Sequence, residues 1–234
     1  MTSPDLPVST LDRIEVLAPL SPQERSAVAR QCSWRRYAAH EQIIDRMSET
    51  KDVCLVVEGR VRVVNHSLSG REVSFDEIEA GGFLGELSAI DGEPRSATVE
   101  ALEETLVAFM APRLFLDLVA GNAQMARNLL LRLTGVIRRS TERIMDLSTL
   151  GANNRVHAEL LRLAKPGRKA NNTALIAPIP VHGDIAARVS TTRETVARVL
   201  NDLAREGIVE RTANALVIRN FEALEDMVEQ VRGV

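Results

Sequence analysis

The chain has 234 residues, of which 45% are hydrophobic and 26% are charged, a composition that excludes an intrinsically disordered protein. Its length predicts two domains, and its formal net charge of −3 gives no overall sign of nucleic-acid binding. No basic segment followed by an apolar run opens the sequence, and no apolar run is long enough to span a bilayer. We therefore expect a cytoplasmic protein without membrane attachment.

The residues that commonly ligate metals are few and scattered. Cys32 and Cys54 are the two cysteines, and they form no CxxC motif. The histidines form no HxH or HExxH motif, and they lie at His40, His66, His157 and His182. The sequence thus predicts no metal site and no enzyme, although a metal-dependent jelly-roll enzyme would share the strand pattern described next.

Short helices at 10–17 and 22–31 are the first expected elements, with Ser21 as the N-cap and Pro22 as the first residue of the second helix. From residue 30 to 111, short apolar runs such as VCLVVEG, VRVV, VSFDEI and TLVAFM alternate with Gly, Asn, Ser or Glu-rich breaks. This pattern is typical of a compact all-β unit.

A long helix is predicted from residue 114 to 150, because the segment lacks proline and its apolar residues recur at three and four. Heptad positions a and d fall on Ala123, Ala126, Leu130, Leu133, Ile137, Ser140, Ile144 and Leu147. Seven of these eight are apolar, which favours pairing with a second copy of the helix. The alternative is a helix packed on its own domain. Gly151, Asn153 and Asn154 tolerate a left-handed C-cap and predict a hinge after the helix.

A second helix, at 155–164, is expected to open a smaller α-rich domain, and it begins a basic segment. Residues 155–169 carry five basic side chains against one acidic one, Glu159, a net of +4. The five are Arg155, Arg162, Lys165, Arg168 and Lys169. Such a segment either makes phosphate contacts or forms an ordinary solvated face.

The segment HGDIAARVSTTRETVARVLNDLAREGIVER, residues 182–211, contains two short apolar-periodic helices joined by a polar break, which is the layout of a helix-turn-helix. Ile185 and Val189 are expected to pack against apolar residues of the second helix, namely Val196, Leu200 and Leu203. At about 100° per residue, Arg193, Glu194 and Arg198 fall on the opposite, polar face. Residues 207–218 predict a β-hairpin wing with Ala213 and Asn214 at its tip.

The polar face of the second helix suits a major-groove site that contains G·C pairs. Arginine donates two hydrogen bonds to guanine O6 and N7, and glutamate accepts one from cytosine N4. The alternative is a surface helix with incidental charges.

The stretch GGFLGELSAIDGEPRSATVEA, residues 81–101, resembles the phosphate-binding cassette of cyclic-nucleotide-binding domains. Together with RETVARVL, it makes the chain resemble the cyclic AMP receptor protein family of bacterial transcription factors from about residue 10 to 220. The resemblance implies an α+β protein. The expected domains are a cyclic-nucleotide-binding β-roll (jelly-roll) with N-terminal helices at 1–111, a long dimerisation helix and hinge at 112–151, and a winged helix-turn-helix at 152–234.

The resemblance also implies a nucleotide site. Glu86 would accept a hydrogen bond from the ribose 2′-hydroxyl, and Arg95 and Ser96 would bind the cyclic phosphate. The backbone at Gly85, Leu87 and Ser88 would approach the sugar and phosphate. Arginine also pairs with a phosphodiester on independent chemical grounds. The alternative is a structural ion pair between Glu86 and Arg95.

Family members place a hydroxyl pair on the long helix to meet the purine, one residue from each subunit, and here that pair falls on Ser140 and Thr141. Ser140 is also the one polar residue among the heptad positions. The order of the two hydroxyls is inverted relative to the enteric activator, which leaves cyclic AMP or cyclic GMP as the effector.

The expected DNA-contacting residues are His182, Thr192, Arg193, Glu194, Thr195 and Arg198. The resemblance implies a homodimer that binds double-stranded DNA at an inverted repeat related to TGTGA–TCACA, with RNA polymerase as an expected partner. Ser190 departs from the family, which often has glycine in this turn. The alternatives are a family member with another effector, or a cyclic-nucleotide-binding module that does not read DNA.

Overall fold

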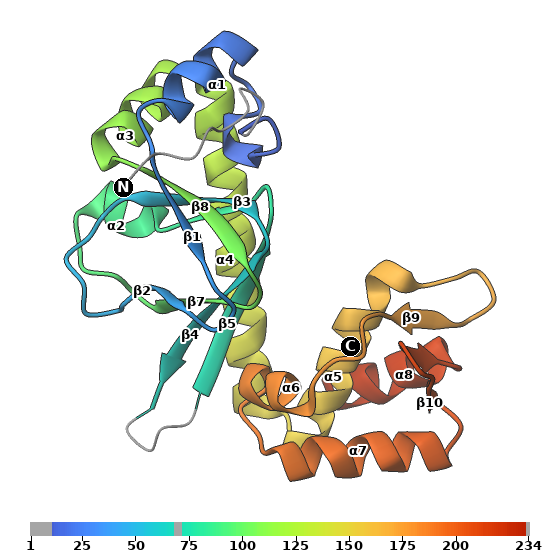
Figure 1. Cartoon of the computed structure of the whole chain (residues 1–234). Helices are drawn as coiled ribbons and strands as arrows, with labels where there is room; N and C mark the ends of the chain where they lie inside the picture. Colours follow the sequence, from blue (N-terminus) through green and yellow to red (C-terminus); the bar gives the residue numbers. More distant parts are fainter. Residues whose placement is uncertain (1–10, 68–71, 233–234) are drawn as a thin grey trace. The chain divides into compact units, whose positions relative to one another are not determined.

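A computed structural model describes residues 11–67 and 72–232 of the chain (Figure 1). The chain divides into two compact units, which meet between Val136 and Ile137. No helix in the described residues is both long and apolar enough to cross a membrane.

The N-terminal unit begins with a short 3-10 helix, Glu15–Leu17, and the helix α1, Pro22–Ala29. The Ser21 hydroxyl accepts a hydrogen bond from the Glu24 amide at 3.3 Å, and the Glu24 carboxylate accepts one from the Ser21 amide at 2.7 Å. This capping box confirms the predicted start of α1. The helix expected at 10–17 is reduced to the 3-10 turn among the described residues, and residue 10 lies outside them.

Two antiparallel sheets of four strands form the predicted β-roll. One has the order β1-β8-β3-β6 and the other the order β2-β7-β4-β5. The strands are β1 (Ser33–Tyr37), β2 (Gln42–Ile44), β3 (Val53–Glu58), β4 (Arg60–His66), β5 (Glu72–Glu79), β6 (Phe83–Leu84), β7 (Thr98–Ala101) and β8 (Thr105–Met110). Buried side chains from both sheets, such as Val56, Val61 and Val99, share one apolar cluster, so the sheets pack face to face. The short helix α2, Glu86–Asp91, connects β6 to β7.

The single helix predicted from residue 114 is instead two helices, α3 (Pro112–Gly121) and α4 (Ala123–Thr149). Asn122 breaks the chain with φ −133° and ψ 103°, and its side-chain oxygen accepts hydrogen bonds from the amides of Gln124 and Met125. An asparagine cap of this kind starts a new helix. The prediction was wrong here because it treated Gly121 as an interior residue of one helix, whereas Gly121 ends α3 and Asn122 caps α4.

The helix α4 has one buried end and a long exposed apolar face. Met125 and Leu129 are buried in the core of the N-terminal unit. The large exposed side chains further along the helix include four of the heptad positions, Leu130, Ile137, Ile144 and Leu147. Packing on its own domain therefore accounts for only the beginning of this helix.

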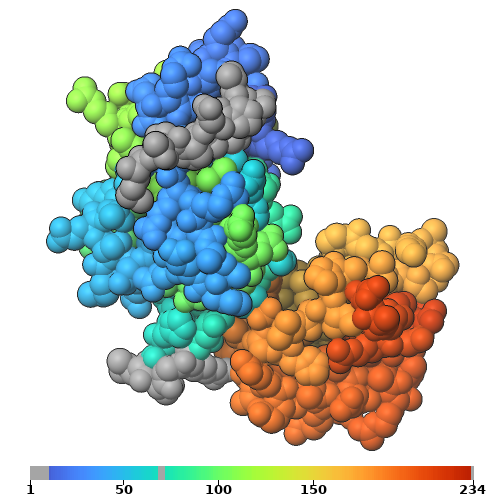
Figure 2. Space-filling view, in the orientation of Figure 1, coloured from blue at the N-terminus to red at the C-terminus, as the bar shows by residue number. Residues whose placement is uncertain are grey.

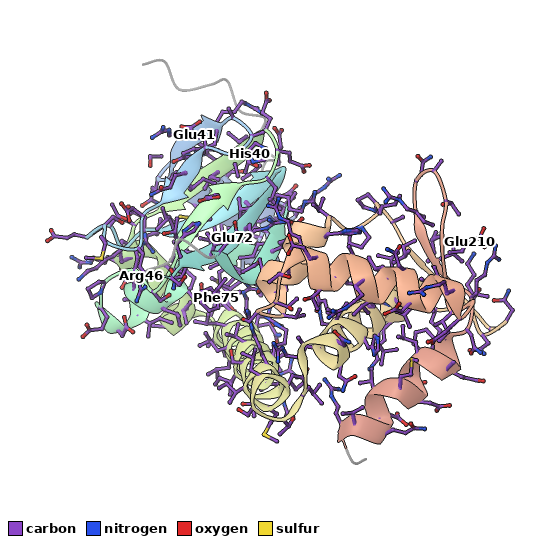
Figure 3. All side chains as sticks on the ribbon, turned by 90° about the horizontal axis from the view of Figure 1, so that it is seen from below. His40, Glu41, Arg46, Glu72, Phe75 and Glu210 are labelled. Atoms are coloured by element: carbon purple, nitrogen blue, oxygen red, sulfur yellow. The ribbon has the colours of Figure 1, made fainter. Side chains whose placement is uncertain are left out.

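The C-terminal unit contains helices and a three-stranded sheet of order β10-β11-β9. Its elements are α5 (Ala152–Ala164), a 3-10 turn (Lys165–Gly167), β9 (Ala174–Ile176), α6 (His182–Arg188), α7 (Arg193–Arg205), β10 (Val209–Arg211), β11 (Leu216–Ile218) and α8 (Phe221–Arg232). Figure 3 shows α7 as a long helix on the near side of this unit, and α5 packs against α6, α7 and α8.

The helix-turn-helix and its wing form as predicted. Ile185, Val189, Val196 and Leu203 share one buried cluster with Leu200 against it. Strands β10 and β11 pair in antiparallel register, with Val209 opposite Ile218, and Ala213 and Asn214 lie in the connecting turn. Strand β9 adds a third strand to this wing that the sequence analysis did not predict.

The left-handed C-cap predicted at the hinge is wrong. Gly151 has φ −64° and ψ 159°, and Asn153 and Asn154 lie inside α5, which begins at Ala152. A Cβ atom added at Gly151 would meet nothing within 4 Å. The joint between α4 and α5 therefore requires glycine neither for its backbone angles nor for space.

Ser190, in the turn between α6 and α7, has φ 52°, which is the left-handed region that glycine adopts without a steric penalty. We expect Ser190→Gly to raise the free energy of unfolding by about 0.5 to 1 kcal/mol, because strain at the Cβ is relieved while some backbone entropy is lost. Urea denaturation followed by circular dichroism measures the change. Ser190→Ala is the matched control, because it removes the hydroxyl and keeps the Cβ. An equal gain in both variants would contradict the strain argument.

Candidate functional site

Glycine residues in the left-handed region bound helix α2 at both ends. Gly85 precedes it with φ 83°, and Gly92 follows it with φ 74°. A Cβ at Gly85 would lie 2.5 Å from Nη1 of Arg95 and 2.9 Å from the Asp52 carbonyl oxygen. Both the backbone angle and the close approach of Arg95 therefore require glycine at position 85.

The Arg95 side chain is buried against the backbone, with the residue only 5% exposed. Its Nη1 donates to the Gly85 carbonyl at 3.2 Å, its Nη2 to the Asp52 carbonyl at 2.7 Å, and its Nε lies 3.4 Å from the Thr50 hydroxyl. Within residues 11–67 and 72–232, no carboxylate forms an ion pair with Arg95. A buried cation with only neutral acceptors is suited to bind an anion.

Glu86, the first residue of α2, is also buried, at 6% exposure. Burial raises the pKa of its carboxyl group, and the charge of Asp76 adds to the rise. Its own backbone amide and the guanidinium groups of Arg132 and Arg95 lower this pKa. The alternative of a direct Glu86–Arg95 ion pair finds no support, because no such pair occurs in the part of the chain that the structure describes. The Glu86 carboxyl is therefore buried without a direct ion pair, and its pKa depends on burial and on the charged groups near it.

The other cassette residues lie in the same segment. Ser88 is 3% exposed, whereas the Leu87 side chain is exposed on α2. Ser96 is exposed beside the buried Arg95, and its carbonyl accepts a hydrogen bond from the Asn65 amide group at 3.2 Å. The structure thus brings the six predicted cassette residues to one connection between β6 and β7.

Helix α4 adds Arg132, a site residue that the sequence analysis missed. Its guanidinium carbon lies 5.2 Å from the centroid of the Phe83 ring, and the group is close enough to Glu86 to lower the pKa of that carboxyl. Its Nε is buried without a hydrogen-bond partner among the described residues. The one sequence signal for it is a cation within the apolar run LLLRL.

Ser140 and Thr141 are exposed on α4, eight and nine residues beyond Arg132 in the sequence. The Thr141 hydroxyl donates to the Ile137 carbonyl at 3.0 Å. Both hydroxyls belong to the C-terminal unit, and their contact with a purine stays a prediction.

The second helix of the helix-turn-helix, α7, presents a charged face. The Thr192 hydroxyl caps the helix by accepting a hydrogen bond from the Thr195 amide at 3.2 Å. Arg193, Glu194 and Arg198 are exposed, whereas the opposite face is buried. The space-filling view shows this orange segment at the surface of its unit (Figure 2).

Contacts within the unit orient several of these side chains. Backbone and Thr192 hydrogen bonds keep the pKa of Glu194 low, so this carboxylate is ionised. The guanidinium of Arg193 lies against Gly183, where a Cβ would be 2.9 Å from its Nε. Arg198 donates to the side chain of Asn153 at 3.3 Å. His182 is half-buried at the start of α6.

Three arginines of the basic segment 155–169 make contacts inside the unit. Arg155 donates to backbone carbonyls, and Arg162 donates to both carboxylate oxygens of Glu159 at 2.7 Å. Arg168 lies 4.3 Å from the centroid of the Phe221 ring. Contacts within the unit therefore account for these three arginines without a phosphate ligand. The two lysines of the segment, Lys165 and Lys169, are exposed.

No group of three or more His, Cys, Asp or Glu side chains able to hold a metal ion occurs in the described residues. His40 lies next to Glu41 in the exposed connection between β1 and β2 (Figure 3).

Comparison with known proteins matches both units. A family model described as "Cyclic nucleotide-binding domain" matches residues 34–122, and one described as "Crp-like helix-turn-helix domain" matches residues 154–227. The chain is 30% identical over 210 residues to "Cyclic AMP receptor protein" of Thermus thermophilus, covering 89% of this chain and 94% of that one. It is 28% identical to "cAMP-activated global transcriptional regulator Vfr" of Pseudomonas aeruginosa, covering 80% and 89% of the two chains.

A solved structure titled as a mutant of CooA from Carboxydothermus hydrogenoformans superposes with a TM-score of 0.79 at 25% identity, covering 92% of this chain and 94% of that one. FixK2 from Bradyrhizobium japonicum shares the fold, with a TM-score of 0.69 at 24% identity and coverage of 84% and 96%.

A cyclic-nucleotide-binding β-roll followed by a winged helix-turn-helix defines a class of ligand-responsive DNA-binding regulators. The chain belongs to the cyclic AMP receptor protein (CRP/FNR) family of transcription regulators. It is accordingly a cyclic-nucleotide-binding and DNA-binding protein, as the sequence analysis predicted.

The buried Glu86 carboxyl should make the stability of the protein depend on pH. Its pKa is raised in the folded state, so the ionised form costs stability as the pH rises through the unfolded and then the folded pKa. Glu86→Gln removes this cost. We expect the variant to melt at a higher temperature than the parent at pH 7 to 8, with a difference that shrinks as the pH falls toward 4.5.

Thermal melts across this pH range test the expectation, with Glu93→Gln as a control at an exposed glutamate just beyond α2. A gain of equal size at every pH would show that ionisation of Glu86 is not the cause.

Proposed function

We propose that the protein is a homodimeric transcription regulator whose binding to an inverted DNA repeat is controlled by cyclic AMP. One observation carries the effector half of this proposal, namely the buried Arg95 that has only neutral acceptors beside the glycine-bounded helix α2. A cyclic phosphodiester supplies the missing negative charge. Arginine pairs with such an anion in bidentate fashion, and Ser96 adds a hydroxyl.

Glu86 would accept a hydrogen bond from the ribose 2′-hydroxyl, with the backbone at Gly85, Leu87 and Ser88 near the sugar. The names of the relatives support cyclic AMP, since two of them are called a cyclic AMP receptor protein and a cAMP-activated regulator. Titration with cyclic GMP tests the competing effector, because serine and threonine hydroxyls both donate and accept hydrogen bonds and so accommodate either purine.

The exposed apolar face of α4 supports the homodimer. Leu130, Ile137, Ile144 and Leu147 recur at heptad spacing and are exposed in the single chain. Large apolar side chains at such spacing are buried when two helices form a coiled coil. Ser140 interrupts this seam, and a ligand that hydrogen-bonds it would compensate for its polarity.

The DNA half of the proposal rests on α7. In a symmetric dimer, two such helices spaced about 34–36 Å apart enter successive major grooves of a two-fold site. Arg193 and Arg198 would contact guanines and Glu194 a cytosine of a repeat related to TGTGA–TCACA. His182, Thr192 and Thr195 would contact the DNA backbone around these bases.

Nucleotide binding would tighten the α4 coil and move the joint at Gly151, so that the two α7 helices reach this spacing. Coupling between two sites is typically about 1–3 kcal/mol, and two ligands act on one dimer. Such a regulator works in the cytoplasm and acts on RNA polymerase at the promoters that it binds.

Arg95→Leu should abolish cyclic-nucleotide binding, because it removes the cation that pairs with the phosphate. Isothermal titration calorimetry with cyclic AMP and cyclic GMP measures the loss, and circular dichroism checks the fold. Arg113→Leu is the control, since this arginine is highly exposed on α3. Normal binding by the Arg95 variant would overturn the assignment of the cassette.

Arg198→Ala should weaken binding to the preferred DNA by about 1–3 kcal/mol and flatten the base preference at one position of each half-site. Selection of binding sites from random DNA measures the preference. Arg205→Ala provides a matched control on the last turn of α7, where the arginine pairs with Asp202. An unchanged base profile for Arg198→Ala would refute its role in base readout.

A further inference from the structure

Arg155 connects the end of α4 to the turn of the helix-turn-helix. Its Nη1 donates to the Leu150 carbonyl at 2.8 Å, its Nε to the Val189 carbonyl at 2.8 Å, and its Nη2 to the Ser190 carbonyl at 3.2 Å. All three acceptors are backbone atoms. The planar guanidinium group has its donors in a fixed fork, so these bonds fix the three carbonyls relative to one another.

Two of these carbonyls belong to the turn that precedes α7, the second helix of the helix-turn-helix and hence its recognition helix. Val189 is the C-cap of α6, and Ser190 has the left-handed φ of 52°. Thr192, two residues later, is the N-cap of α7. The direction of the chain at Val189 and Ser190 therefore determines where α7 begins and how it is aimed.

The third carbonyl belongs to the residue before Gly151. A Cβ at Gly151 would meet nothing within 4 Å, so the glycine itself makes no packing contact that would hold the joint between α4 and α5. The last turn of α4 is held to α8, where Arg232 donates to both carboxylate oxygens of Asp146. The bond from Arg155 to Leu150 crosses this joint, and Leu150 itself is buried in the core of the C-terminal unit. Arg155 thus adds a hydrogen bond across a joint at which the glycine itself makes no packing contact.

A second attachment one helical turn later holds α6 on the same side of α5. Glu159 is 8% exposed, accepts two hydrogen bonds from Arg162, and lies 3.7 Å from Nη1 of Arg188 in the last turn of α6. The turn itself is closed by a hydrogen bond from the Thr191 amide to the Ala186 carbonyl at 3.0 Å. Arg155 adds the side-chain contacts that hold this turn to the start of α5.

We infer that Arg155 is a positioning residue for DNA readout, which fixes the recognition helix to the end of α4 and makes no contact with phosphate itself. This inference rests on the proposed DNA-binding function. It assigns an internal role to a residue whose place in the basic segment 155–169 otherwise indicates a phosphate contact.

The two roles predict different DNA-binding behaviour. A phosphate contact contributes equally to all sequences, and its loss lowers the slope of log K against log salt by about one. A positioning residue contributes to the preferred sequence alone and leaves the salt slope unchanged. We therefore expect Arg155→Ala to weaken binding to the preferred site at least tenfold and binding to random DNA less than twofold.

The experiment uses the full-length protein and the site that the parent protein selects from random DNA, so no operator sequence is assumed. Affinities for this site and for a scrambled duplex are measured over a salt series with Arg155→Ala, Arg155→Lys and the exposed control Lys165→Ala. Equal losses on both duplexes with a reduced slope for Arg155→Ala would overturn the inference.

Arg155→Lys keeps the charge but not the planar fork, and it preserves the test if the alanine variant fails to fold. We expect it to recover part of the lost preference, whereas full parental preference would show that charge alone suffices and would overturn the inference. Calorimetry with cyclic AMP should give parental affinity for both variants. If the nucleotide leaves DNA binding by the parent unchanged, the proposed effector is wrong, but the comparison of the variants still decides the role of Arg155.

Discussion

The buried cation at Arg95 is the constraint on which the nucleotide site depends. Taking a guanidinium out of water is costly unless hydrogen bonds or an opposite charge compensate it. Here the Gly85 and Asp52 carbonyls supply part of the compensation, and they do so only because Gly85 has no Cβ and adopts a left-handed conformation. The buried charge is therefore one reason for glycine at position 85, beside the left-handed backbone conformation that leads into α2 and Glu86.

The C-terminal unit uses arginine differently. Arg155 is compensated by three backbone carbonyls and Arg162 by the Glu159 carboxylate, so these two charges serve the folding of the unit. By contrast, Arg193 and Arg198 extend from a helix whose opposite face is buried. One residue type thus serves as internal scaffold and, under the proposed function, as an exposed DNA contact.

This distinction explains how far the sequence could predict the molecule. The helix-turn-helix was predictable because periodic apolar residues and a polar break specify it within a short segment, and the cassette was predictable from its resemblance to cyclic-nucleotide-binding domains. The break at Asn122, the added strand β9 and the approach of Arg132 to Glu86 were not. The break had a local signal in Gly121 and Asn122, which the apolar periodicity outweighed. The other two depend on a pairing partner or a contact distant in sequence. The same holds for Arg155, whose acceptors at Val189 and Ser190 lie 34 and 35 positions away.

Helix α4 is where the two proposed activities must meet, because it is the one helix that spans the division between the units. Its buried turns carry Met125 and Leu129 in the core of the N-terminal unit, and Leu150, just past its end, is buried in the core of the C-terminal unit. Between them four apolar heptad positions are exposed, at Leu130, Ile137, Ile144 and Leu147. If this face pairs with a second copy, as proposed, a change in that pairing acts on a helix that contributes to both cores. Under the proposed function, the nucleotide acts on DNA through the stability of this middle segment. A displacement of the helix end would strain the hydrogen bond from Arg155 to Leu150 and the ion pair between Arg232 and Asp146.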